Sequence, residues 1–365
     1  MNIRIDKTKI KDYELENYKN KCNEALDRIW TEEWLTRSVT KADRQALDVI
    51  EQTAESIKRQ KKNVIVITSG EIRKLVKAVQ GLVPEEEDGV KVTIMGDSFS
   101  PYDYVKILNE NENNEFILLV ITGKEDSVSV KGAYATLKQL LVSKFGLEKA
   151  AEDIYVVASD KENSIAQDAQ ENSCTTLYYS PGMPELYCGG AEPVLLLLSI
   201  MGYDTEKYLD GFRDMLSSPA WDLDAADYSI AKAIAYKNGY EGRVLFMQRQ
   251  LEDFAEWVAA TECLSTSKAV MLPSGKGENE GRIFNTYLSI DRDEDDIMMP
   301  FFEGCHEDGS LNLLMNETGD RYFFEETEKL PGVKLSMEWM EPYNLGQLIA
   351  FIQLSNLITE FLYNN

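Results

Sequence analysis

Short runs of β-branched and aliphatic residues recur along the first half of the chain, each followed by a segment with helical spacing. The runs lie at residues 63–68, 90–95, 116–122, 153–159 and 175–180. Strands that read as unbroken apolar runs are typical of parallel sheets buried on both faces. Because parallel strands need crossover connections, usually helices, the pattern predicts an α/β fold with helices on both sides of a parallel sheet.

A second set of such elements follows. Runs at 243–247, 269–272 and 333–339 accompany a helical segment at 249–262, and the chain between the last two runs reads as a loop. We therefore expect a helical leader over residues 1–60, a first α/β domain over 61–190 and a second over 191–365. The apolar segment 343–363 is long enough to cross a bilayer, but Gln347, Gln353, Asn356 and Glu360 interrupt it, so we expect a buried helix.

The charge balance narrows the classes of partner. The 365 residues include 38 Lys and Arg against 63 Asp and Glu, a net charge of −25. Such a chain repels phosphate backbones and anionic lipid surfaces, so we expect no nucleic-acid and no membrane partner. Five cysteines without a CxxC pair are typical of reduced thiols in the cytoplasm. With His306 as its one histidine, the chain has no His-rich metal centre, and we expect neither a metal nor another cofactor.

Three loops fall where an open parallel sheet binds its ligands, at the carboxyl ends of strands and beside helix N-termini. They are residues 68–71, 122–129 and 180–190. Thr122, Lys124 and Ser127 in the second loop offer the hydroxyls and the cation that a phosphate requires. The alternative is a capping loop whose hydroxyls close helix ends, and the neighbouring Glu125 and Asp126 disfavour an anion.

Several short motifs stand in the order found in a known enzyme family. They are Pro219-Ala220-Trp221, Lys237-Asn238-Gly239, Phe254-Ala255-Glu256-Trp257, Gly96-Asp97-Ser98, Gly189-Gly190, Tyr343-Asn344-Leu345-Gly346 and the loop 121–129. Over most of its length the chain resembles bacterial glucose-6-phosphate isomerase. The resemblance implies two sugar-isomerase (SIS) domains, each an α/β/α sandwich, in a homodimer. It also implies interconversion of glucose 6-phosphate and fructose 6-phosphate through an enediol, without a metal. In that reaction a glutamate moves the proton, an arginine stabilises the charge, and a histidine and a lysine assist ring opening.

Carried onto this sequence, the resemblance assigns two groups of binding residues. The phosphate of the substrate falls to Ser69, Gly70, Thr122, Gly123, Lys124 and Ser127, and the loops that line the cleft contain Gly96, Gly189 and Gly190. In the first loop, either Glu71 or, with a shifted alignment, Ser69 takes the place of the family's serine.

The catalytic positions differ from the family. Ala191 stands where the arginine should follow Gly189-Gly190. The glutamate motif falls near residues 286–291, which leaves Asp291 as its carboxylate, and the histidine motif falls near Glu325. His306 lies elsewhere, and we find no counterpart of the family's lysine.

These substitutions leave three functional hypotheses. The first is a relative that keeps the fold, binds a sugar phosphate or related anion, and has little turnover. The second is an active aldose–ketose isomerase on another sugar phosphate, with Asp291 or Glu325 as base and Lys124 as anchor. The third is a non-catalytic structural interaction protein.

Overall fold

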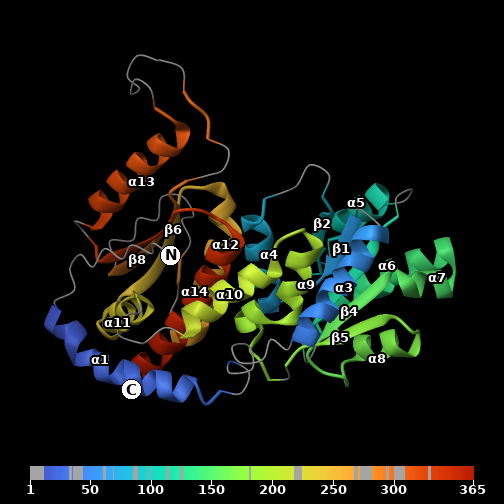
Figure 1. The fold of residues 1–365 in the computed structure, drawn as a ribbon, viewed down its shortest axis with the longest axis horizontal. Coiled ribbons are helices and arrows are strands. Elements are labelled where there is room, and N and C mark those ends of the chain that lie inside the picture. Colours follow the sequence, from blue (N-terminus) through green and yellow to red (C-terminus); the bar gives the residue numbers. More distant parts are fainter. Residues whose placement is uncertain are drawn as a thin grey trace. The chain divides into compact units, whose positions relative to one another are not determined.

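The protein forms two compact units, each built of helices around a sheet. The computed structural model describes residues 12–32, 35, 44–60, 63–68, 70–84, 89–96, 98, 100–111, 115–123, 126–180, 182–217, 224–266, 270–271, 282–292, 296–299, 309–327 and 330–365. The first unit comprises Trp34–Thr205, and the second comprises helix α1 (Asp12–Ile29) with Glu206–Asn365. Both sheets are parallel throughout (Figure 1), so the predicted α/β class is confirmed.

The first unit contains a sheet with the strand order β2-β1-β3-β4-β5. Its strands are β1 (Asn63–Ile67), β2 (Lys91–Met95), β3 (Ile117–Thr122), β4 (Ile154–Ala158) and β5 (Thr175–Tyr178). Its helices are α3 (Arg44–Gln60), α4 (Gly70–Leu82), α5 (Pro101–Asn111), α6 (Val128–Phe145), α7 (Leu147–Glu152), α8 (Ser164–Glu171), the short 3-10 helix η1 (Glu185–Gly190) and α9 (Glu192–Ile200).

Helices cover both faces of this sheet, which explains the unbroken apolar strands. Leu118 and Val120 of β3 pack in one cluster with Val130 of α6. The residues between them on β3 point to the opposite face and are equally buried, because side chains alternate along a strand. On that opposite face, Tyr155 of β4 lies with its hydroxyl 3.5 Å from the hydroxyl of Ser56 on α3. Each fully buried aliphatic side chain contributes about 1.5–3 kcal/mol, so a strand with two buried faces favours this three-layer arrangement.

The strand order creates a topological switch point between β1 and β3. From β1 the chain first moves outward to β2, then returns to the other side of β1 to form β3. The connections therefore leave the carboxyl ends of β1 and β3 in opposite directions, and the crevice between them is the general ligand position of such sheets.

The second unit contains a sheet with the order β7-β6-β8-β9. Its strands are β6 (Glu241–Phe246), β7 (Val270–Met271), β8 (Ile283–Ile290) and β9 (Gly332–Met337). Besides α1, its helices are α10 (Thr205–Ser217), α11 (Asp224–Lys237), the 3-10 helix η3 (Arg249–Leu251), α12 (Glu252–Thr266), α13 (Leu311–Thr327) and α14 (Pro342–Asn364). The two helices predicted for the leader thus lie in different units, α1 here and α3 in the first.

Helix α14 is the central helix of the second unit. It is long and apolar enough to span a bilayer, but 83% of its most apolar window is buried inside the protein, where α1, α11 and α12 pack on it. The expectation of a buried helix is confirmed. Its N-terminal part approaches α10 so closely that a Cβ on Gly346 would lie 1.9 Å from the carbonyl oxygen of Tyr208. Only glycine fits at this crossing.

The loop predicted between residues 272 and 333 is wrong in two places, because β8 and α13 lie there. Strand β8 is central in its sheet and buried along its whole length. Polar residues interrupt its apolar run in the sequence, and two of them are hydrogen-bonded to other elements in the folded protein. The hydroxyl of Thr286 lies 2.8 Å from that of Tyr228, and Asn285 accepts a hydrogen bond of 2.8 Å from Arg243 Nε.

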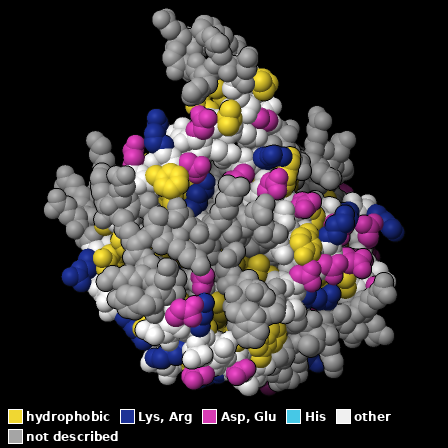
Figure 2. Space-filling view, turned by 60° about the vertical axis from the view of Figure 1, so that its left-hand side comes forward, with side chains coloured by type: hydrophobic (Ala, Val, Ile, Leu, Met, Phe, Trp, Pro, Cys, Tyr) yellow, Lys and Arg dark blue, Asp and Glu magenta, His cyan; other side chains and the backbone are white. Residues whose placement is uncertain are grey.

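The surface reflects the composition. Acidic side chains are spread over the described surface in Figure 2, as the net charge of −25 requires. Some apolar side chains are also exposed, among them Leu313 and Phe324 of α13.

Candidate functional site

The switch point of the first sheet brings together two of the predicted phosphate-binding residues. Ile67 of β1 pairs with Val120 of β3, so the loops that follow these strands emerge side by side. Gly70 begins α4 after β1, and Gly123 follows β3 directly. The predicted Ser69 and Lys124 lie outside the described residues.

A third loop places a carboxylate between these two glycines. Glu185, the first residue of η1, extends its side chain into the notch that they leave. A Cβ added to Gly123 would lie 1.9 Å from Oε1 of Glu185, and one added to Gly70 would lie 3.6 Å from Oε2. The backbone N–H of Ile72, in the first turn of α4, donates a hydrogen bond to this carboxylate. An internal anion therefore lies at the helix N-terminus beside the switch point.

The surroundings of Glu185 are acidic. Burial raises the pKa of its carboxyl above the usual value, the N–H of Ile72 opposes that rise, and the charges of Glu71 and Asp126 add to it. Burial also raises the pKa of Asp126. Two groups oppose this rise: Asn163 Nδ2, which donates a 2.6 Å hydrogen bond to the carboxylate, and the charge of Lys131. Among the described residues that act on the carboxyl of Glu185, the charged ones named here are all acidic.

The hydroxyls predicted to hold phosphate have different surroundings. The side chain of Ser127 is the N-cap of α6, accepting from the N–H of Val130 at 3.3 Å, and it lies 2.7 Å from the hydroxyl of Ser129. The hydroxyl of Thr122 is buried and has no hydrogen-bond partner among the described residues. Ser127 therefore serves the capping role that was the alternative interpretation, and Thr122 retains an unused hydroxyl at the end of β3.

The glycines predicted to line the cleft, Gly96, Gly189 and Gly190, lie in tightly packed segments of the first unit. Gly96 has φ +119°, and a Cβ there would lie 2.6 Å from the carbonyl oxygen of Thr68. Gly189 and Gly190 end η1, which packs on α4. Ala191 then forms the N-cap of α9 and is buried, and burial raises the pKa of the following Glu192. A methyl group and a carboxylate thus stand where the resemblance calls for an arginine.

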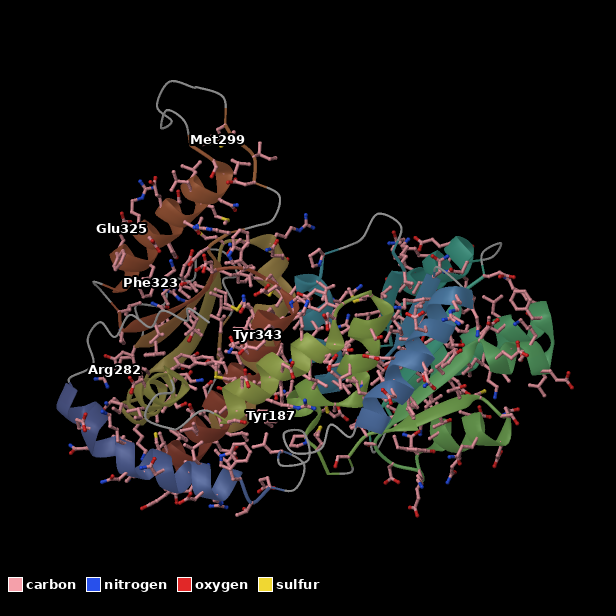
Figure 3. All side chains as sticks on the ribbon, viewed as in Figure 1. Tyr187, Arg282, Met299, Phe323, Glu325 and Tyr343 are labelled. Atoms are coloured by element: carbon pink, nitrogen blue, oxygen red, sulfur yellow. The ribbon has the colours of Figure 1, made fainter. Side chains whose placement is uncertain are left out.

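The two predicted catalytic carboxylates in the second unit do not share a site. Asp291 follows β8 at its carboxyl end, where its carbonyl accepts a hydrogen bond from Asn316 of α13. Glu325 lies further along the same helix and is exposed (Figure 3). The separation is 325 − 316 = 9 residues, or about 13 Å at 1.5 Å per residue. Glu325 therefore lies about two and a half helical turns beyond the residue of α13 that contacts Asp291.

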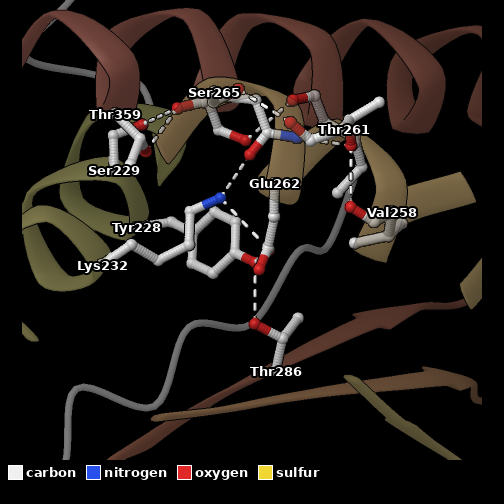
Figure 4. A network of polar contacts seen from close by, with 12 residues as sticks. Tyr228, Ser229, Lys232, Val258, Thr261, Glu262, Ser265, Thr286 and Thr359 are labelled. Carbon is white, nitrogen blue, oxygen red and sulfur yellow. Dashed lines mark hydrogen bonds and ion pairs between the residues drawn. The ribbon is translucent and has the colours of Figure 1, made fainter. Parts of the chain in front are cut away.

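A second cluster of ionisable groups is sealed inside the second unit (Figure 4). Lys232 Nζ of α11 lies 3.2 Å from Glu262 Oε1 of α12, and both side chains are 1% exposed. The hydroxyls of Tyr228 and Tyr236 donate to the same carboxylate at 2.8 and 2.9 Å, and Asn356 of α14 accepts from the lysine. Because no member of this pair reaches the surface, the cluster joins three helices rather than binding a substrate.

Within the described ranges, no three Asp, Glu, His or Cys side chains are grouped as a set of metal ligands. His306 and the motif Pro219-Ala220-Trp221 fall outside those ranges.

The fold and the switch-point edge define a class. Two parallel α/β sheets covered by helices, followed by a long C-terminal helix, form a protein with two domains of the sugar-isomerase type. The structure superimposes on that of a hypothetical protein from Thermus thermophilus with a TM-score of 0.87, at 14% identity, over 99% of this chain and 94% of that one. It superimposes on a glucose-6-phosphate isomerase from Chlamydia trachomatis with a TM-score of 0.78, at 10% identity, over 98% of this chain and 83% of the other.

The sequence comparison is more specific. The chain is 21% identical to glucose-6-phosphate isomerase from Streptococcus thermophilus, over 88% of its own length and 79% of the relative's. The same enzyme from Streptococcus pneumoniae is 21% identical over 88% of this chain and 80% of the relative. No family model matches the chain. The resemblance to the glucose-6-phosphate isomerase family is thereby confirmed, and the low identity shows that the chain has diverged from these relatives.

Glu185 is the site residue that sequence reasoning missed. The loop 180–190 was expected at the ligand edge, but its sequence does not say which side chain turns inward. The usable signal was the pair Gly70 and Gly123, one glycine after each of two neighbouring strands, since glycine often marks the close approach of another group.

Proposed function

We propose that the protein is a glucose-6-phosphate isomerase relative with little or no isomerase turnover, which has kept the fold for a role in binding a sugar phosphate or a related anion. One observation carries the proposal: the arginine position is taken by the buried Ala191, followed by Glu192. The likeness in fold and the collinear sequence match support the family part of the proposal.

The chemistry explains why this substitution matters. Moving a proton between adjacent carbons requires a base and a fixed positive group for the enediolate that forms. Loss of one such stabilising group costs about 10²–10³ in kcat. Here a methyl group replaces the cation, and a carboxylate beside it repels the developing negative charge.

The test is a coupled assay in which purified protein converts fructose 6-phosphate and the glucose 6-phosphate formed is oxidised with production of NADPH. We expect its kcat to be at least about 10²-fold below that of an active isomerase assayed in parallel, since enzymes typically have kcat values of about 1–10³ s⁻¹. The Streptococcus thermophilus enzyme, assayed in parallel, is the positive control. Turnover at an ordinary rate would reject the proposal and favour an active isomerase. If Asp291 were its base, Asp291→Asn would abolish that turnover.

Binding distinguishes this proposal from a purely structural protein. In a calorimetric titration with a panel of hexose phosphates, we expect at least one of them to bind saturably. If none binds, the proposed ligand-binding role is rejected and a structural role is favoured. Following the resemblance, we expect a cytoplasmic homodimer.

A further inference from the structure

The carboxylate of Glu185 satisfies the geometric conditions of a bound anion. It lies at the switch point, fills the notch between Gly70 and Gly123, and accepts the N–H of Ile72 at the positive end of α4. A helix N-terminus provides free N–H groups and a partial positive charge, which is why phosphates and carboxylates bind there. In this chain the anion is supplied by the protein itself.

We propose that Glu185 is an intramolecular substitute for a ligand's phosphate group, which closes the phosphate site of the first unit until the side chain is displaced. The inference rests on the proposed function in one respect, that the ligand is a phosphate monoester. It assigns to η1 the role of an internal plug.

Shape supports this assignment. Gly123 has no side chain, and Oε1 of Glu185 lies only 1.9 Å from the position that a Cβ would take. The same notch therefore cannot hold both the carboxylate and a phosphate oxygen. Removal of the Glu185 side chain would expose the N–H of Ile72 and the space beside Gly123 to a ligand of similar size.

Unused hydrogen-bonding groups support it as well. Thr68 follows β1 and Thr122 ends β3, so both lie at the edge where the plug sits. Their hydroxyls are buried, and neither has a hydrogen-bond partner in the part of the chain that the structure describes. A buried hydroxyl without a partner is costly, and ligand oxygens at this edge would remove that cost.

The negative charge of Glu185 disfavours phosphate binding while its side chain fills the notch. A phosphate carries about −1.5 to −2 charges at neutral pH, and a carboxylate in contact with it repels it even in water. Repulsion from Glu185 alone therefore weakens phosphate binding about tenfold or more. Burial raises the pKa of Glu185, which indicates that its charged form is held there at a cost.

The experiment is a calorimetric titration of inorganic phosphate into the full chain and its variants. We expect Glu185→Ala to bind phosphate about tenfold or more tightly than the wild type. Glu185→Gln should lie between them, because its amide still fills the notch without the charge.

Two controls separate a plug from a simple change in charge. Glu71 is exposed in the first turn of the same helix, so Glu71→Gln removes the same charge and leaves the notch filled. Because the charge of Glu71 also acts on this site, we expect Glu71→Gln to gain phosphate affinity, but by clearly less than Glu185→Ala. In the double variant Gly123→Ala with Glu185→Ala, the added methyl group occupies the notch, and the gain should disappear.

Three results would overturn the inference: equal phosphate affinity in the wild type and Glu185→Ala, an equal gain in Glu71→Gln, or no phosphate binding by either Glu185 variant while circular dichroism shows both folded. Failure of the proposed function would appear separately, as isomerase turnover by the wild type.

Discussion

Replacement of Lys232 by methionine should destabilise the second unit, because the change leaves the carboxylate of Glu262 charged in the interior. Lys232 Nζ lies 3.2 Å from Glu262 Oε1 and 4.3 Å from the centre of the Tyr228 ring, and both charged side chains are 1% exposed. Burial lowers the pKa of Lys232, and Glu262 opposes that effect. The ammonium group is thus held in the interior by its partner.

The magnitude follows from the contacts that remain. Removing one member of a buried ion pair costs about 3–5 kcal/mol. Two hydrogen bonds from tyrosine hydroxyls, at 2.8 and 2.9 Å, still reach the carboxylate of Glu262, so we place Lys232→Met near the lower limit, at about 3 kcal/mol. The double variant Lys232→Met with Glu262→Gln carries no buried charge, and its amide can accept from one tyrosine hydroxyl through its oxygen and donate to the other through its NH2 group. It should cost less than the single Lys232→Met.

The assay is urea unfolding followed by tryptophan fluorescence, to which the buried Trp257 of α12 contributes. The control is Lys237→Met, on the exposed end of the same helix, which should change stability by less than about 0.5 kcal/mol. A loss below about 1 kcal/mol for Lys232→Met would refute the reasoning. So would a double variant whose loss equals the sum of the two single losses, since independent sites add.

Three other substitutions test the packing by thermal unfolding. Gly346→Ala should destabilise the second unit by about 3 kcal/mol, because the new Cβ would meet the carbonyl oxygen of Tyr208 at 1.9 Å. Gly132→Ala, at an exposed position in the second turn of α6 where the nearest atom would be 3.9 Å from the Cβ, should instead stabilise the protein by about 0.5–1 kcal/mol. If both alanine variants behave alike, the close crossing of α10 and α14 is refuted. Gln353→Met should stabilise by about 1–3 kcal/mol, since Gln353 is fully buried and neither of its amide atoms has a hydrogen-bond partner among the described residues. An unchanged or lower melting temperature would show that this amide is satisfied in solution.

Strands β1, β3 and β4 were the most readily predicted, because a strand buried on two faces is apolar at almost every position. Strand β3 is the clear case, with all its residues buried. Strand β8 was missed although it is just as buried, because Asn285, Thr286 and Ser289 interrupt its apolar run. Thr286 and the amide oxygen of Asn285 have partners on other elements, which cannot be read from local sequence, whereas the hydroxyl of Ser289 has none among the described residues.

The meeting of these loops at one edge of the first sheet was predictable for a similar reason. Loops after parallel strands meet at one edge whatever their sequence, so Gly70, Gly123 and the loop 180–190 could be assigned to it. The occupant of that edge could not be assigned. Glu185 comes from a loop about sixty residues beyond Gly123 in the chain, and its inward direction depends on how η1 packs on α4.

The sequence by itself determined the class of fold, the parallel pairing and the resemblance to an isomerase family, because apolar periodicity and the order of motifs are properties of the chain alone. Only the tertiary structure decided which charges are buried and what they contact. It put Lys232 against Glu262 and the carboxylate of Glu185 against the N-terminus of α4. Electrostatic energy depends on distance and on exclusion of water, and for residues far apart in the chain both are set only when the fold is complete.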